Sequence, residues 1–373
     1  MGLNRKLQLP SVPLLTLVCS GLLLFGSACS NQTSISSSEN NTAQETEKSI
    51  VVASFASDVV VPTYEKLVVK ANNLSTAVDA FVSNPNNDTL KAAQEAWIAA
   101  RFPWERSEAF AFGPADSLGY DGDLDDWPVN ETDVVAVLKS SDKFSPEYIK
   151  GLQTTQKGFH TIELLLFGDD NNKQAGSFSP RELELVKSLA RAFQETADEL
   201  LISWVDGVAG NPPYQEVFAS AGDSENIAYP TVAAAMEEIV QGMIGCLDEV
   251  ANEKIGEPLE TKSTEGLESR FSNSSLNDFK HNINSVKNAY LGSLDGEVAA
   301  TSLSSWVAKQ NPELDQQLKS ELDAAIASLK AVPAPIEQKI TETEALAKME
   351  EAQGKILTVF ATVEGKILPL VQS

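Results

Sequence analysis

Apolar residues recur three and four positions apart along most of the chain from about residue 48 onward, which is the spacing of one face of an α-helix. The strict alternation typical of β-strands is scarce. The clearest helical segment covers residues 179–207, and its apolar face is formed by Leu185, Leu189, Phe193, Ala197, Leu200 and Trp204. Ser179 is expected to cap this helix, with Pro180 in the first turn and Glu182 completing a capping box. Gly207 is expected to end it.

The same periodicity predicts further helices that together form an all-α protein. They cover residues 64–81, 88–112, 145–153, 157–168, 229–252, 275–292, 301–332 and 335–371. In the second of these, Asp88 is the expected N-cap, and Gly113 with Pro114 the expected stop. The segments expected to be loops are residues 113–133 and 253–275. We expect two packed helical bundles, over residues 48–255 and 256–373.

The N-terminus is predicted to be an export signal rather than part of the fold. Arg5 and Lys6 precede an apolar run at residues 14–25, which is too short to span a bilayer. Small residues then lead to Cys29, as in a bacterial lipoprotein signal over residues 1–29, with ordinary cleavage nearby as the alternative. Residues 30–47 are polar and are expected to be a flexible tether. The protein is therefore predicted to be exported and held in the periplasm or cell envelope by a lipid on Cys29, which gives it a membrane as a partner.

The charge balance narrows the other partners. Asp and Glu number 53 against 28 Lys and Arg, for a formal net charge of -25. Nucleic acid is excluded as a partner, because phosphate binding needs clustered cations. An acidic surface is compatible with cation capture, although a solvated surface is the commoner reason for it. Cys246 lies in an apolar helical pattern and is expected to pack as a small hydrophobe, so no disulfide framework is predicted.

The stretch GFHTIELLLFG, residues 158–168, carries the first candidate site. His160 and Glu163 stand three residues apart, so on a helix they share a face. Together they supply two ligands for zinc, iron or manganese, or else form a hydrogen-bonded pair in which Glu163 orients the ring. Position 164 is Leu, so the paired histidines of a zinc-protease helix are missing.

A second candidate stretch is AWIAARFPWERSEAFAFGP, residues 96–114. Helical spacing places four of its residues on one face, namely Trp97, Arg101, Trp104 and Glu108. Charges on such a face need partners, because burying an unpaired charge is costly. Arg101 can pair with Glu105 one turn later, which leaves Glu108 in need of a cation or a donor. Pro103 should kink or interrupt the helix.

Two other features carry weaker signals. Residues 121–128, DGDLDDWP, imitate a calcium loop, but Asp126 stands where glycine is required and Thr132 where Glu is expected. A solvated acidic loop is the commoner structure, although one of its acids could reach the candidate site. His281 has no acid three or four residues after it and is expected to be structural or exposed.

Four ordered blocks make the chain resemble the imelysin family of bacterial cell-envelope proteins, and they cover residues 58–64, 96–114, 158–168 and 268–292. Gly158, His160 and Glu163 match the G-x-H-x-x-E motif of that family. The polar positions of its first-helix block are matched by Arg101, Glu105 and Glu108. In the last block, His281 departs from the polar or acidic residue expected there. The resemblance implies two packed helical bundles, with the site at their junction or in the N-terminal half.

The family includes a peptidase and proteins linked to iron uptake, so the resemblance implies two hypotheses. In the first, the protein binds iron, or else zinc or another divalent cation, for uptake with an iron-transport permease as partner. The implied ligands are Glu105, Glu108, His160 and Glu163, and the residues expected to hold them in place are Arg101 and Asp126. In the second, His160 and Glu163 are catalytic residues of a metallopeptidase that acts on proteins outside the cytoplasm. We favour binding, because the site offers one histidine and no evident oxyanion donor.

Overall fold

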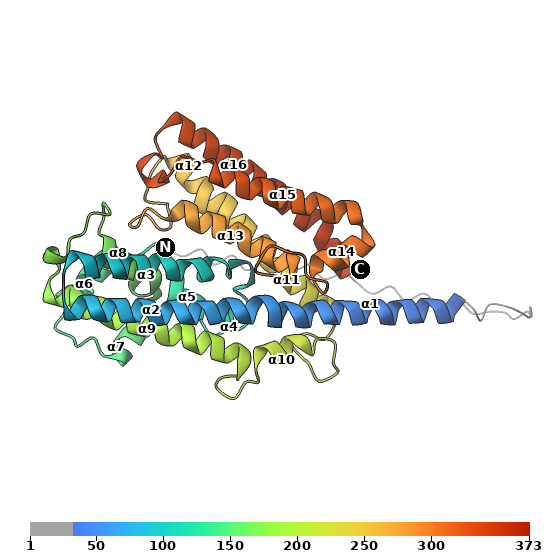
Figure 1. Cartoon of the computed structure of the whole chain (residues 1–373). Helices are drawn as coiled ribbons and strands as arrows, with labels where there is room; N and C mark the ends of the chain where they lie inside the picture. Colours follow the sequence, from blue (N-terminus) through green and yellow to red (C-terminus); the bar gives the residue numbers. More distant parts are fainter. Residues whose placement is uncertain (1–32) are drawn as a thin grey trace, which may run out of the picture. The chain divides into compact units, whose positions relative to one another are not determined.

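The computed structural model describes residues 33–373, with side chains from Gln44 onward, so the predicted signal peptide and Cys29 lie outside the described residues. The all-α prediction is confirmed, since residues 33–373 contain helices and no strand (Figure 1). The longer helices are α1 (Thr33–Phe55), α2 (Val61–Ser83), α3 (Asn87–Glu105), α8 (Gly158–Phe167), α9 (Pro180–Val205), α11 (Val232–Asp248), α13 (Ser275–Leu291), α15 (Pro312–Lys330) and α16 (Thr343–Thr362).

Shorter helical segments connect these. The α-helical ones are α4 (Pro114–Ser117), α5 (Tyr120–Asp125), α6 (Glu131–Lys139), α7 (Pro146–Lys150), α10 (Tyr214–Ala219), α12 (Glu257–Thr261), α14 (Leu303–Gln310) and α17 (Leu368–Gln372). The π-helical ones are η1 (Ala56–Val60), η5 (Glu249–Gly256) and η7 (Val363–Ile367). The 3-10 turns are η2 (Glu108–Phe110), η3 (Thr154–Gln156), η4 (Ala175–Ser177) and η6 (Ile336–Gln338).

Residues 43–373 form one compact unit, within which the helices pack in two neighbouring groups. In one group α2 lies against α3 and α9, and α8 packs on α3 and α9. In the other, α13 packs on α11 and α15, and α16 on α15 and η5. Helix α13 also contacts α3 and η2, which joins the two groups (Figure 1). Because α11 precedes residue 255 and yet packs with later helices, the division into two bundles at 255/256 stays a prediction.

The capping prediction for residues 179–207 is confirmed by α9. The Ser179 side chain accepts the backbone N–H of Glu182 at 3.2 Å, and the Glu182 carboxylate accepts the N–H of Ser179 at 2.7 Å. The helix ends at Val205, and Gly207 then adopts a φ of 80°. These features account for both ends of the helix that carries the strongest periodic pattern in the sequence.

Replacing Ser179 with Ala is expected to lower the free energy of unfolding by about 1 kcal/mol, because the first turn of α9 loses a side-chain acceptor. Urea unfolding followed by circular dichroism measures this change. Ser224→Ala is the matched control, since Ser224 is exposed and no side-chain hydrogen bond involves it among the described residues. Equal unfolding midpoints for the two variants would show that the cap contributes nothing.

Several predicted boundaries differ from the structure. The segment 113–133, predicted to be a loop, contains α4, α5 and the start of α6, and the segment 253–275 includes the end of η5 and α12. Helices of four to six residues are too short for their periodicity to show in a sequence. The N-cap of α3 is Asn86 rather than Asp88, because the Asn86 side chain accepts the N–H groups of Asp88 and Thr89. Helix α3 also ends at Glu105, well before the expected stop.

Helix α1 begins at Thr33, inside the segment predicted to be a flexible tether. That segment contains no Pro or Gly, so nothing in it stops a helix that continues into the packed residues after it. Its role as a membrane tether stays a prediction. Within residues 33–373 no helix is both long enough and apolar enough to cross a bilayer. Cys246 is buried in α11 as expected, with its sulfur 3.5 Å from the carbonyl oxygen of Asn282.

Candidate metal centre

Helix α8 presents His160 and Glu163 on one buried face. Gly158 opens the helix with a φ of 74° and lies so close to α5 that a Cβ on it would stand 2.4 Å from the carbonyl oxygen of Leu124. His160 Nδ1 lies 3.2 Å from Glu163 Oε2, and Glu163 Oε1 accepts the backbone N–H of Ser272 at 2.8 Å. Glu163 therefore uses both oxygens inside the protein and orients the imidazole, whose Nε2 faces the other way.

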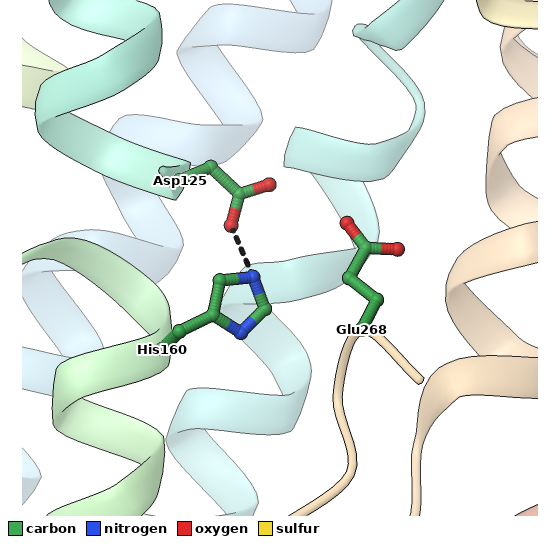
Figure 2. A group of neighbouring side chains, drawn as sticks. All are labelled: Asp125, His160 and Glu268. Atoms are coloured by element: carbon green, nitrogen blue, oxygen red, sulfur yellow. Dashed lines mark ion pairs between the residues drawn. The ribbon is translucent and has the colours of Figure 1, made fainter. Parts of the chain in front are cut away.

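His160 Nε2 faces two carboxylates from other elements. It lies 3.1 Å from Asp125 Oδ1 at the end of α5, and the two groups form an ion pair when the ring is protonated. Glu268, from the segment that precedes α13, approaches from another side (Figure 2). One ligand atom from each of Asp125, His160 and Glu268 lies within 4.8 Å of the others. An imidazole nitrogen and two carboxylates at this spacing can hold a divalent cation.

Arg101 is the buried cation at the middle of this cluster. It is 1 % exposed and forms ion pairs with four acids, namely Glu105, Asp125, Glu268 at 3.1 Å and Asp278 at 3.4 Å. Its guanidinium also stands over the ring of Phe159, 4.8 Å from the ring centre. Since acids from α3, α5, α13 and the segment before α13 meet on one guanidinium, Arg101 holds the carboxylates of the centre in position.

A second set of ligand atoms adjoins the first. Oxygens of Glu105, Glu268 and Asp278 also lie within 4.8 Å of one another, so Glu268 belongs to both sets. Glu268 Oε2 and Asp278 Oδ1 accept no hydrogen bond and form no ion pair among the described residues, whereas Glu105 Oε1 is paired with Arg101. Among the other contacts, Asn282 donates to Glu105 at 2.6 Å and Lys254 donates to Glu268 at 3.0 Å. Buried oxygens without hydrogen-bond donors are atoms that a bound cation would satisfy.

An acidic cavity of about 620 Å³ adjoins the centre. Nine carboxylate residues line it, and they are Glu108, Asp121, Asp125, Asp126, Glu249, Glu253, Glu257, Glu265 and Glu268. Lys254, which is 2 % exposed, is the one Lys or Arg among the described residues of the lining. Its ammonium bridges Glu249 and Glu268 at 3.4 and 3.0 Å. A wall of this charge attracts cations and repels anions.

Burial and charge act against each other on the titratable groups of the centre. Burial works to lower the pKa of His160, but Asp125 and Glu163 outweigh it and raise that pKa to about 9. Burial works to raise the pKa of Asp125, but Arg101 and His160 bring that pKa down to about 2. For Asp278, burial prevails over Arg101 and raises the pKa to about 7. The neighbours of Asp125 therefore favour its ionised form, whereas burial disfavours the ionised form of Asp278.

The structure brings together only part of the predicted site. His160, Glu163 and Glu105 are buried in it, and Arg101 pairs with Glu105 as expected. Glu108 follows the end of α3 and lines the cavity instead of meeting His160. Burial raises the pKa of the Glu108 carboxyl well above the usual range.

Asp126, predicted to hold the ligands in place, lines the cavity and accepts a hydrogen bond from Thr154. Its neighbour Asp125 takes the place next to Arg101 and His160. Because Asp125 is the last residue of α5 and Asp126 follows the helix, the two side chains leave the chain in different directions. The acidic segment 121–126 therefore does contribute a carboxylate next to His160, but from Asp125 rather than from Asp126.

The sequence prediction includes neither Glu268 nor Asp278, although both are members of the centre. Asp278 lies on α13, and Glu268 lies in the segment before it. Both belong to the block 268–292, which carries part of the family resemblance. The acids of that block were therefore the sequence feature from which these two site residues could have been predicted. No spacing within the block connects them to His160, which is more than 100 residues earlier in the chain.

Comparison with known proteins agrees with this architecture. The family model described as Imelysin, Peptidase_M75, matches residues 60–363. Iron-regulated protein A of Synechococcus elongatus is 35 % identical over 372 residues, covering 100 % of this chain and 97 % of that protein.

Two solved structures are also similar. An iron-regulated protein A precursor from Parabacteroides distasonis is 29 % identical, with a TM-score of 0.79 over 86 % of this chain and 95 % of that one. An imelysin-like protein from Psychrobacter arcticum shares the fold, with a TM-score of 0.67 at 14 % identity over 88 % of this chain and 96 % of that one. The family match spans most of the chain and the Synechococcus relative all of it, and the chain therefore belongs to the imelysin family.

Proposed function

We propose that this protein binds a metal cation, iron in the first place, through Asp125, His160 and Glu268. The observation that carries the proposal is the buried Nε2 of His160, which lies 3.1 Å from Asp125 Oδ1 and within 4.8 Å of a carboxylate oxygen of Glu268 as well. One imidazole and two carboxylates suit ferrous iron, and they also suit manganese and zinc. The name of the Synechococcus relative, an iron-regulated protein, favours iron among these metals.

The surroundings support a role in capture. The nine acids of the cavity would concentrate cations close to the centre. Glu163 would fix the His160 ring by accepting from Nδ1, which is the usual way in which a carboxylate supports a histidine ligand. Arg101 and Lys254 offset part of the negative charge, so the carboxylates can remain together before a cation arrives.

The cellular part of the proposal rests on the sequence. A lipid on Cys29 would hold the protein at the cell envelope, in the periplasm or on its membranes, and the captured iron would pass to an iron-transport permease. Detection of the full chain in a membrane fraction, with release to the soluble fraction on Cys29→Ala substitution, would support the anchor. A wild-type chain found only in the soluble fraction would contradict it.

A metallopeptidase is the alternative suggested by the family description. The geometry favours it less, because peptide hydrolysis needs a donor for the developing oxyanion. Both terminal nitrogens of the Arg101 guanidinium are already paired with carboxylates. Cleavage of a denatured protein substrate by the metal-loaded wild type, lost in Glu163→Ala, would establish the peptidase instead.

His160→Ala is expected to weaken Fe²⁺ binding at least about tenfold, because the variant loses the nitrogen ligand. Anaerobic calorimetric titration of the metal-depleted protein measures the affinity, with Mn²⁺ and Zn²⁺ titrated in parallel. His281→Ala is the matched control, since it removes the other histidine of the chain and should leave the affinity within about twofold of wild type. Equal affinities of wild type and His160→Ala would contradict the proposed site.

A further inference from the structure

A cationic groove lies on helices α2 and α3, outside the candidate metal centre. Three basic residues line it, Lys66 and Lys70 from α2 and Arg106 from the C-cap of α3. Its apolar lining includes Phe102, Pro103 and Leu294. The cavity measures about 170 Å³. Three cations around one small apolar groove are unexpected on a chain with a formal net charge of -25.

The three cations have no acidic partner. Within the part of the chain whose side chains are described, the ammonium groups of Lys66 and Lys70 make no ion pair or hydrogen bond. Arg106 uses only Nε, which donates to His281 Nδ1 at 3.1 Å, so its two terminal nitrogens have no partner there. The fully buried cations of this acidic protein, Arg101 and Lys254, are paired with carboxylates. The unpaired charges therefore make this groove a place of positive potential.

His281 fixes the orientation of Arg106. An arginine can only donate, so His281 Nδ1 accepts and the ring is neutral. Burial lowers the pKa of His281 to about 4, and the cations Arg106, Lys280 and Arg101 add to this effect. The ring also packs on Phe102, with ring centres 4.6 Å apart. Arg106 is thus held in place by a neutral group that cancels none of its charge.

The lining selects among anions. Phe102 remains 38 % exposed at the groove, and Pro103 adds a second apolar side chain to its wall. A phosphate or sulfate ion would lose hydration against these apolar walls with no apolar part of its own to bury there. A single planar carboxylate matches the paired terminal nitrogens of an arginine. The volume is below the range of drug-sized pockets, so only a small molecule would fit.

We propose that this groove binds a small organic acid, consisting of one carboxylate on a short apolar body. Arg106 receives the carboxylate through its terminal nitrogens, and Lys70 and Lys66 add charge at the rim. The apolar body lies against Phe102 and Pro103. This site shares no ligand with the metal centre, so it stands whether or not the protein binds iron.

The test uses benzoate as the probe, titrated into the full-length metal-depleted protein and followed by ligand-observed NMR. Benzoate is expected to bind at least about tenfold more tightly than benzyl alcohol, its uncharged counterpart, and than inorganic phosphate. Arg106→Gln should weaken benzoate binding about tenfold or more, and Lys70→Gln about threefold. Lys91→Gln, which removes an exposed lysine paired with Glu95 on the same helix α3, should leave it unchanged.

Lys70→Gln keeps the test informative even if Arg106→Gln fails to fold. The Lys70 side chain is part-exposed and makes no ion pair or hydrogen bond that the substitution would break, so this variant is expected to fold. Benzoate binding no tighter than that of benzyl alcohol would overturn the proposal, because the charge would then be irrelevant. Phosphate binding as tight as that of benzoate would overturn it as well, by showing general attraction of anions. Equal losses in Lys70→Gln and Lys91→Gln would also overturn it, by placing the probe elsewhere on the surface.

Discussion

Replacing Arg101 with Met is expected to lower the free energy of unfolding by about 3–5 kcal/mol at pH 7.5, because it leaves buried carboxylates without their cation. The side chain is buried and pairs with four acids, while methionine fills a similar volume without charge. The cost therefore comes from electrostatics rather than from a cavity. Urea unfolding of wild type and variant, in metal-free buffer, measures it.

The destabilisation should be smaller at pH 5 than at pH 8. With Arg101 present, the pKa of Asp278 is already raised to about 7 by burial, and Arg101 opposes that rise. An acid whose pKa is raised on folding disfavours the folded state increasingly as pH climbs from its unfolded value through its folded one. Removing Arg101 raises that folded pKa further and extends the penalty to higher pH. At pH 5 the carboxyl is protonated in the folded state of both proteins, so this part of the difference shrinks.

Arg191→Met is the control for Arg101→Met. The Arg191 side chain is 59 % exposed and stands 3.9 Å from Asp79, so its loss should change the unfolding free energy by less than about 0.5 kcal/mol. Equal effects of the two substitutions, or a cost for Arg101→Met that does not vary with pH, would refute the role of Arg101 as the holder of the carboxylates.

The local part of this arrangement could be predicted from sequence, and the distant part could not. Arg101 with Glu105, and His160 with Glu163, lie one helical turn apart, so periodicity alone places each pair together. Asp278 meets Arg101 across 177 residues, and no local pattern encodes such a contact. Most of the long segments could be predicted to be helices from their apolar faces, because long amphipathic helices carry a strong periodic signal.

The positions of Glu108 and Asp126 in the cavity wall rather than beside His160 have a common cause. The prediction for Glu108 extends the helical spacing beyond Glu105, where α3 ends and a 3-10 turn redirects the chain. The prediction for Asp126 selects one acid of a run in which Asp125 closes the short helix α5, and a shift of one residue turns a side chain away from the site. A sequence therefore indicates which kinds of residue form a site more readily than which position along the chain places a side chain in it.

Gly158→Ala is expected to lower the free energy of unfolding by about 2–5 kcal/mol and to weaken Fe²⁺ binding together with it. The glycine has a φ of 74°, a conformation that costs an L-residue about 1–2 kcal/mol. A Cβ would also stand 2.4 Å from the Leu124 carbonyl oxygen, and this neighbour is backbone, so it cannot rotate aside. Helix α8 or α5 would have to move.

That movement matters for the site because Leu124 directly precedes Asp125. Gly158 lets the start of α8 touch the end of α5, and this contact sets the 3.1 Å separation between His160 Nε2 and Asp125 Oδ1. Pushing the two helices apart would separate two of the three proposed ligands. The glycine of the G-x-H-x-x-E motif is therefore explained by close packing of backbone on backbone, and the histidine depends on it for its position.

Gly119→Ala separates the two costs of Gly158→Ala. Gly119 has nearly the same φ, 75°, but a Cβ there would meet nothing within 4 Å, so only the conformational cost of about 1–2 kcal/mol is expected. Unfolding free energies and Fe²⁺ affinities of both variants are compared under the same conditions. If Gly119→Ala destabilises the protein as much as Gly158→Ala does and both retain the wild-type affinity, the approach of α8 to α5 is no constraint on the site. A larger loss confined to Gly158→Ala, with weaker metal binding, would locate the constraint at the contact between Gly158 and Leu124.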